Sequence, residues 1–155
     1  MDFDTAFTLL IGNEGGYTND PRDPGGETMY GISKRSYPTE DIKNMTLGRA
    51  KWLYQRDYWG PAGCDVVPDG IKFDLFDMAV NSGVKNAVKA LQKAVSEIED
   101  GVLGGRTVMA VQSMDAMRLV ARFNGARLLH LTSSSTWVDF GKGLVNRVAN
   151  NLLKA

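Results

Sequence analysis

The sequence has little of the chemistry that metal sites and disulfide frameworks need. Its 155 residues include one cysteine, Cys64, and one histidine, His130. A single cysteine cannot form an internal disulfide, and no CxxC or histidine-rich spacing offers a metal site. His130 lies in the apolar stretch RLLHLT, which favours a structural or surface role over a catalytic one. We therefore expect neither a metal nor an organic cofactor.

An excess of charge of either sign is also missing. Eighteen Lys and Arg balance eighteen Asp and Glu, so the net charge favours neither nucleic acid nor an anionic membrane as a partner. The first residues carry two aspartates and no basic residue before a short apolar run, unlike a secretory signal. No run approaches the roughly 18 apolar residues of a membrane span. We expect a chain made in the cytoplasm without a signal peptide or membrane anchor.

What is present is the patterning of a mainly α protein. The first segment has apolar residues at helical spacing behind the capping residue Asp2: Phe3, Phe7, Leu10 and Ile11. Later helices are expected over about 46–58, 70–82, 84–98, 105–113, 115–132 and 139–153. The length fits one domain. We therefore predict a mainly α domain with a small β-hairpin insert after the first helix.

The insert is the stretch GNEGGYTNDPRDPGGETMYGIS, residues 12–33. Its glycines and prolines exclude helix, whereas YTND and TMYGIS could pair around the DPRDPGGE turn. Glu14 comes at the end of the first helix, directly before two glycines. The carboxyl end of a helix dipole favours the protonated form of a carboxyl group. Glu14 is thus a candidate general acid.

Several chemistries could use the acidic side chains of this loop. An EF-hand that starts at Asp20 fails, because Arg22 and Pro24 occupy two ligand positions, and the glycines match no phosphate-binding motif. Glycoside hydrolysis needs a protonated carboxyl and a second polar or ionised group, which Glu14 and Asp23 could supply. Asp20 is a rival for the second carboxylate. In the alternative interpretation, the aspartates and glycines only form turns.

The residues of this loop resemble those of a known family. EGGYTNDPRDPGGETMYGIS is similar to the opening motif of glycoside hydrolase family 108, the N-acetylmuramidases of the lysozyme-like superfamily. The rest resembles the helical predicted peptidoglycan domain that accompanies it, through FDMAVNSG (76–83), ALQKAV (90–95), DGVLGGRT (100–107) and FGKGLVNRV (140–148). The resemblance covers about residues 4–149. It implies one lysozyme-like domain over 1–155, with a catalytic lobe at about 4–68 and a peptidoglycan-binding lobe at about 69–153.

The resemblance implies a role for particular residues. Glu14 matches the family's general acid. Asp23 follows it after eight residues, as the second carboxylate does in phage-type lysozymes, and Thr28 follows Asp23 after four residues where those enzymes have five. Thr28 would therefore position water only if the loop tolerates the shorter spacing.

Four further residues are candidate substrate contacts. The aromatic faces of Tyr17 and Tyr30 suit the apolar side of a sugar ring. Asn81 and Arg147 lie in the family's later motifs. Each also has a structural interpretation, Asn81 as part of a helix end before Gly83 and Arg147 as a solvated side chain. Both interpretations stay open at this stage.

The implied activity is that of a lysozyme, cleaving the β-1,4 bond between N-acetylmuramic acid and N-acetylglucosamine in peptidoglycan. A bacteriophage endolysin of this type would reach the wall after another protein permeabilises the membrane. We expect a monomer whose partner is the glycan strand. The alternatives are a chitinase-like hydrolase and a non-catalytic wall-binding module.

Overall fold

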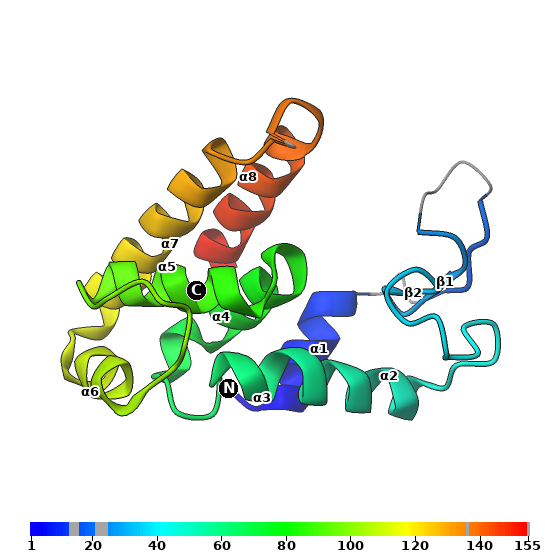
Figure 1. Ribbon diagram of the computed structural model, residues 1–155, viewed down its shortest axis with the longest axis horizontal. Helices are drawn as coiled ribbons and strands as arrows, with labels where there is room; N and C mark the ends of the chain where they lie inside the picture. The colour runs from blue at the N-terminus through cyan, green and yellow to red at the C-terminus, as the bar shows by residue number, and fades with distance from the viewer. Residues whose placement is uncertain (13–15, 21–24, 136, 155) are drawn as a thin grey trace. The chain divides into compact units, whose positions relative to one another are not determined.

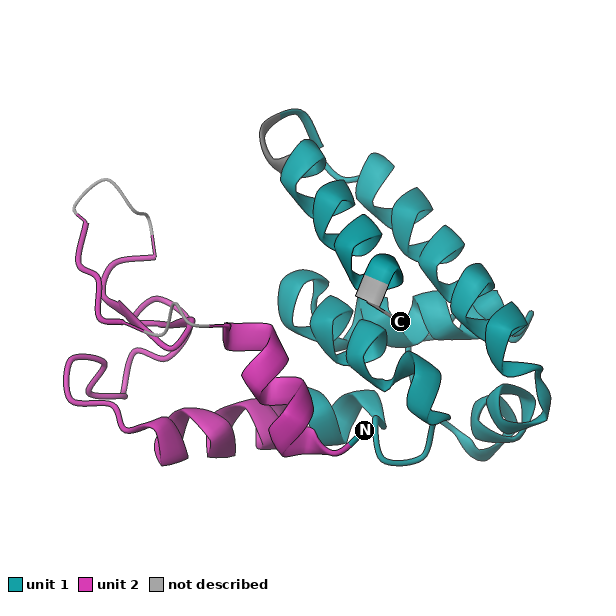
Figure 2. Ribbon diagram, turned by 180° about the vertical axis from the view of Figure 1, so that it is seen from behind, with its two compact units in different colours: residues 1, 58–155 teal, residues 2–57 magenta. Residues whose placement is uncertain are grey.

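The chain folds into two compact units in a computed structural model that describes residues 1–12, 16–20, 25–135 and 137–154 (Figure 1). The N-terminal unit spans Asp2–Asp57, and the C-terminal unit spans Tyr58–Ala155 together with Met1 (Figure 2). The expected mainly α, lysozyme-like architecture with a small hairpin after the first helix is confirmed. The expected division into lobes near residue 68 stays a prediction.

Two helices carry the N-terminal unit. In α1 (Phe3–Ile11) the Asp2 carboxylate accepts a 2.8 Å hydrogen bond from the backbone N–H of Thr5, which confirms the expected cap. Thr46 begins α2 (Leu47–Tyr54) in the same way. The ring of Phe7 meets that of Tyr54 edge to face, with 5.4 Å between their centroids. These aromatic side chains join the two helices in one small core.

The hairpin is shorter than the sequence suggested. Strand β1 (Thr28–Met29) pairs antiparallel with β2 (Ile32–Ser33) around Tyr30 and Gly31. Both turn residues have positive φ, 50° and 76°, as a type I′ turn requires. Residues 28–33 thus pair among themselves because a two-residue turn closes the smallest loop. The expected partner YTND contributes one bridge, between Thr18 and Thr28.

The helix expected to end near residue 58 continues in altered form. After α2 the chain makes a π-helical turn, η1 (Gln55–Trp59), and then α3 (Gly60–Ala62). The indole N–H of Trp59 donates to Asp65 at 2.8 Å, and its ring packs edge to face on Phe76. Cys64 follows and is fully buried. Burial raises the pKa of its thiol to about 12.

Five longer helices form the rest of the C-terminal unit: α4 (Asp69–Ser82), α5 (Val84–Ala94), α6 (Gly105–Ser113), α7 (Ala116–Thr132) and α8 (Trp137–Lys154). Their core is fully buried and includes Phe76, Leu91 and Phe123. The helix expected over 84–98 ends at Ala94, because Ser96 adopts a positive φ of 61° and Gln92 binds the following loop. The last two helices form an antiparallel pair (Figure 1).

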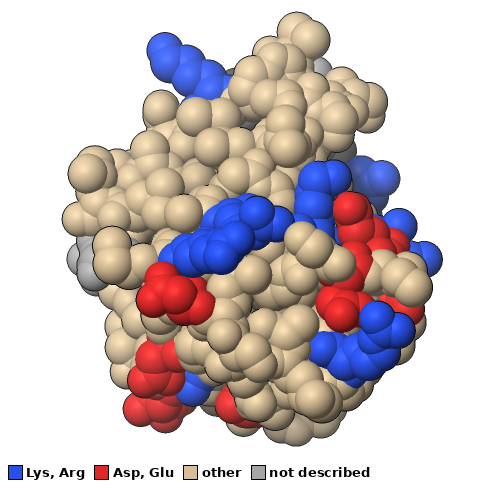
Figure 3. Space-filling view, turned by 90° about the vertical axis from the view of Figure 1, so that its left-hand side faces the viewer, with Lys and Arg blue, Asp and Glu red and all other residues tan. Residues whose placement is uncertain are grey.

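The surface carries charge of both signs. On the face drawn in Figure 3, basic and acidic side chains lie among uncharged ones, without an extended field of one sign. Some surface charges of the protein are paired, as in the 3.4 Å contact between Lys93 and Glu99. Within the described part of the chain, no helix is long and apolar enough to cross a bilayer.

Candidate functional site

The acidic loop of the N-terminal unit is closed by a backbone bridge. Thr18 and Thr28 exchange two N–H···O hydrogen bonds, each of 2.9 Å. A second pair of backbone contacts continues this arrangement, from Lys34 to Glu27 at 2.8 Å and from Arg35 to Gly25 at 3.2 Å. The residues on both sides of the loop, Thr18 and Thr28, are therefore hydrogen-bonded to each other at the start of the hairpin. Glu14 and Asp23 lie outside the described residues.

Tyr17 and Glu27 form a side-chain pair beside this bridge. The Tyr17 hydroxyl donates to Glu27 Oε1 at 2.8 Å. This bond to a carboxylate raises the pKa of Tyr17 above its ordinary value of 10.0. The Tyr17 side chain remains exposed. The hydrogen bond to Glu27 thus fixes the hydroxyl of an exposed ring.

Thr28 is half-buried at the start of β1. Its hydroxyl donates to the carbonyl oxygen of Gly26 at 3.3 Å, and its backbone is fixed by both Thr18 and Ser33. Tyr30 is half-buried at the turn, where its carbonyl accepts a 3.2 Å hydrogen bond from Tyr54. The structure therefore brings Tyr17 and Thr28 to the same short stretch of paired backbone. Asp20 is half-buried in the loop between them.

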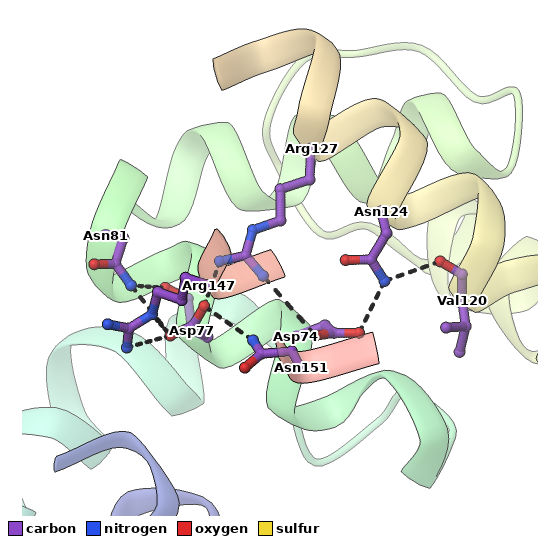
Figure 4. Close-up of polar contacts among 8 residues, drawn as sticks. All are labelled: Asp74, Asp77, Asn81, Val120, Asn124, Arg127, Arg147 and Asn151. Atoms are coloured by element: carbon purple, nitrogen blue, oxygen red, sulfur yellow. Dashed lines mark hydrogen bonds and ion pairs between the residues drawn. The ribbon is translucent and has the colours of Figure 1, made fainter. Parts of the chain in front are cut away.

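The other two expected contacts meet in the C-terminal unit, around Asp77 of α4 (Figure 4). The side-chain amide of Asn81 donates to the Asp77 carbonyl at 2.7 Å and to its carboxylate at 3.2 Å. The Arg147 guanidinium donates to the same carboxylate at 2.6 Å. Asn81 therefore lies on the last turn of α4 as expected. Arg147, in contrast with the solvated alternative, forms an ion pair.

Asp77 is completely buried and organises the packing of three helices. Its carboxylate also accepts from Arg127 of α7 and, at 3.3 Å, from Asn151 of α8. Charged donors on several sides offset the loss of hydration that burial imposes on a carboxylate. The resulting network ties α7 and α8 to α4 (Figure 4).

Asp74 extends this network one helical turn earlier. It accepts a 2.9 Å hydrogen bond from Asn124, whose amide also donates to the Val120 carbonyl at 3.1 Å. The Arg127 guanidinium lies 3.8 Å away. Burial raises the pKa of Asp74, although Asn124 and Arg127 oppose the shift. The C-terminal unit thus contains two buried carboxylates on α4, and Arg127 lies beside both of them.

Comparison with known proteins decides the family. A family model described as "Glycosyl hydrolase 108" matches residues 7–83. A solved structure of SagA from Brucella abortus is similar over 96% of this chain and 90% of its own, with 35% identity and a TM-score of 0.84. A search of curated proteins found no match. The chain belongs to glycosyl hydrolase family 108.

As a family 108 member, the protein is a glycoside hydrolase that acts on peptidoglycan. The matched residues include the acidic loop and hairpin as well as Asn81. Within the described ranges, the structure groups no three His, Cys, Asp or Glu side chains in a way that could hold a metal ion.

Sequence reasoning missed two contacts of the candidate site residues. Glu27 is one of the acidic residues that the sequence offers in the loop, but its pairing with Tyr17 depends on the hairpin register and could not be predicted. Asp77 was overlooked because it lies inside the apolar run FDLFDMAV. A charge in such a run is rarely buried without a partner, and that was the available signal.

Proposed function

We propose that the protein is a muramidase that cleaves the β-1,4 bond between N-acetylmuramic acid and N-acetylglucosamine. The observation that carries this proposal is the family match across a loop in which Glu14, Asp23 and Thr28 follow one another at near-lysozyme spacing. The closed Thr18–Thr28 bridge supports it, since catalytic groups on loops need a rigid base.

In the proposed reaction Glu14 is protonated before attack and gives its proton to the glycosidic oxygen. The bond from the anomeric carbon to that oxygen breaks as positive charge develops on the sugar ring. Asp23 accepts a proton from a water molecule that attacks the opposite face. The product sugar therefore has an inverted anomeric centre. Asp20 is the alternative base, since it lies in the same loop.

Thr28 would orient the attacking water through its hydroxyl. Its half-buried position on β1 and its fixed backbone support this role, and the 3.3 Å bond to Gly26 is weak enough to be exchanged for water. Tyr17 and Tyr30 are proposed to stack on sugar rings. Asn81 and Arg147 would contact the strand through the atoms that Asp77 leaves free.

The main test is Glu14→Gln, which keeps the size of the side chain and removes the proton donor. We expect release of reducing ends from purified peptidoglycan to fall by about 10²–10⁴-fold, the usual contribution of a general acid. Glu99→Gln is the matched control, since Glu99 is exposed in a loop of the other unit. Undiminished hydrolysis by folded Glu14→Gln would refute the assignment of Glu14.

Substrate and mechanism can be tested in the same assay. Faster turnover of chitin oligomers than of peptidoglycan would favour the chitinase-like alternative, and folded wild-type protein that binds walls without releasing sugar would favour the non-catalytic one. NMR of the first product distinguishes inversion from retention. The endolysin role predicts lysis of bacteria from within only when a membrane-permeabilising protein is co-expressed.

A further inference from the structure

A pocket of about 390 Å³ lies in the C-terminal unit, where the end of α4, the start of α5 and the turn between α7 and α8 come together. Its volume is within the range of about 300–1,000 Å³ that is usual for small-molecule sites. The lining includes Asn81, Asn86, His130, Ser133, Ser135 and Leu144. Of these residues, only Asn81 has a part in the proposed function.

The lining has a consistent chemical character. It consists of amide, hydroxyl and imidazole groups together with two leucines, and no Lys, Arg, Asp or Glu of the described chain borders it. A phosphate or carboxylate ligand would find no cation there, and a metal ion or ammonium group would find no carboxylate. The pocket therefore suits an uncharged ligand that carries several hydroxyl or amide groups.

The two side-chain amides of the lining are held in place by the hydrogen bonds that they donate, which leaves the Oδ1 atom of each available to a ligand. Asn81 donates both of its hydrogen bonds to Asp77, and Asn86 donates to the Ser82 carbonyl at 2.8 Å. Neither Oδ1 atom accepts a hydrogen bond from the described residues, so both are open to ligand donors. Fixed acceptors cost little conformational entropy when a ligand binds.

The remaining lining complements these acceptors. The Ser133 hydroxyl donates to the His130 carbonyl at 2.9 Å, which leaves its oxygen able to accept. The half-buried imidazole of His130 can donate through one nitrogen and accept through the other when neutral. Leu131 and Leu144 add an apolar surface of the kind that covers the C–H face of a pyranose.

We propose that this pocket is a sugar subsite that binds an N-acetylated hexosamine, and not the charged peptide attached to it. The inference rests on the proposed function in that the glycan strand supplies the sugar, whereas the binding itself needs no catalytic group. It assigns to the α4, α5 and α7 ends a part in holding the strand.

His130 provides a direct reporter, because it is the only histidine in the chain. Full-length Glu14→Gln protein is titrated with the N-acetylglucosamine tetramer, and in parallel with a free Ala-Glu-Lys peptide, while the His130 ring signals are followed by NMR. We expect saturable shifts with the tetramer and none with the peptide. Asn86→Ala should weaken the tetramer's affinity by about 3- to 10-fold, the usual effect of one lost hydrogen bond.

Controls separate binding from folding. Asn150→Ala is the matched change on an exposed position of α8 and should leave the affinity unchanged. If Asn86→Ala loses its helical circular dichroism, Ser135→Ala tests the same pocket with a smaller change. An unmoved His130, a shift with the peptide alone, or equal affinities of the pocket and control variants would each overturn the proposal.

The outcome is independent of the muramidase assignment. A silent His130 together with normal peptidoglycan hydrolysis by the wild-type protein would reject the pocket and leave the proposed function in place. A saturable His130 response in a protein that hydrolyses no peptidoglycan would support the pocket and reject the proposed function.

Discussion

The two units of the chain keep their charged and polar groups in different places. All buried polar side chains of the described residues belong to the C-terminal unit: Asp74, Asp77, Gln92, Thr107, Asn124 and Arg127. The N-terminal unit keeps its ion pairs near the surface, as in Glu40–Arg49 and Asp4–Lys51. Its indole of Trp52 is exposed and lies 4.4 Å from the guanidinium carbons of both Arg49 and Arg56.

This difference separates two ways of specifying a structure. A buried, paired carboxylate such as Asp77 allows few alternative helix arrangements, because every misplacement leaves a charge without its partner. Surface pairs exclude few alternative arrangements, since water can replace either partner. The N-terminal unit instead depends on backbone geometry, above all at the hairpin turn.

The largest effect is expected for Asp77→Asn. It removes the carboxylate that lies closest to the guanidinium of Arg127, which is 2% exposed and keeps only the 3.8 Å contact with Asp74. Breaking a buried pair typically costs about 3–5 kcal/mol, so the free energy of unfolding should fall by that amount in urea titrations. Glu99→Gln breaks an exposed pair in the same unit and should change little. Similar losses for both variants would contradict the comparison.

A smaller loss is expected for Gly31→Ala in the N-terminal unit. Gly31 has a φ of +76°, and an added Cβ would lie 2.5 Å from the Tyr54 hydroxyl. Backbone strain and overpacking together should lower stability by about 1–3 kcal/mol. Gly48→Ala is the matched control: Gly48 lies in α2 with open space around it, so alanine should stabilise the unit slightly. Thermal unfolding of the two variants should therefore shift in opposite directions.

The smallest effect concerns pH. The Arg56 guanidinium holds the pKa of Asp57 below its ordinary 3.8, so the stability that this contact adds is present above that value and is lost as the pH falls through the lower, folded-state pKa. Burial raises the pKa of Asp74, so the protonated form is favoured in the folded state. The stability that this protonation adds is fully present below pH 3.8 and is lost as the pH rises through the folded-state pKa. Acidification should thus destabilise the surroundings of Asp57 and stabilise those of Asp74.

Amide hydrogen exchange can detect this contrast. Between pH 6 and pH 3, protection factors corrected for intrinsic rates should decrease around Tyr37 and Asp57, which share a 2.9 Å hydrogen bond, relative to those around Asp74 and Asn124. Asp57→Asn should remove the change in the first region only. A parallel decrease in both regions would contradict the prediction.

Most helix ends could be predicted because they depend on local signals. Asp2 and Thr46 cap helices as the sequence indicates, and Gly83 with a φ of 86° separates α4 from α5. The hairpin was less predictable, since Tyr30 occupies a turn position that normally favours glycine or asparagine. The Tyr54 hydroxyl that binds its carbonyl comes from 24 residues further along the chain.

The candidate site also has a part that could be predicted from local sequence and a part that could not. Local spacing was enough to single out the acidic loop, and the Thr18–Thr28 bridge lies where pairing was expected. The convergence of Asn81 and Arg147 on Asp77 could not be predicted, because it joins residues up to 70 positions apart and depends on helix packing. Periodicity identifies the buried face of each helix but not its partner.

The buried thiol of Cys64 makes the chain behave as a cysteine-free protein toward alkylating dyes. With its pKa near 12 and no exposed surface, this side chain forms almost no thiolate at neutral pH. A cysteine introduced at Asn86 or Asn19, both exposed, would thus be the only site to react. A single fluorophore could then report ligand arrival without prior replacement of Cys64.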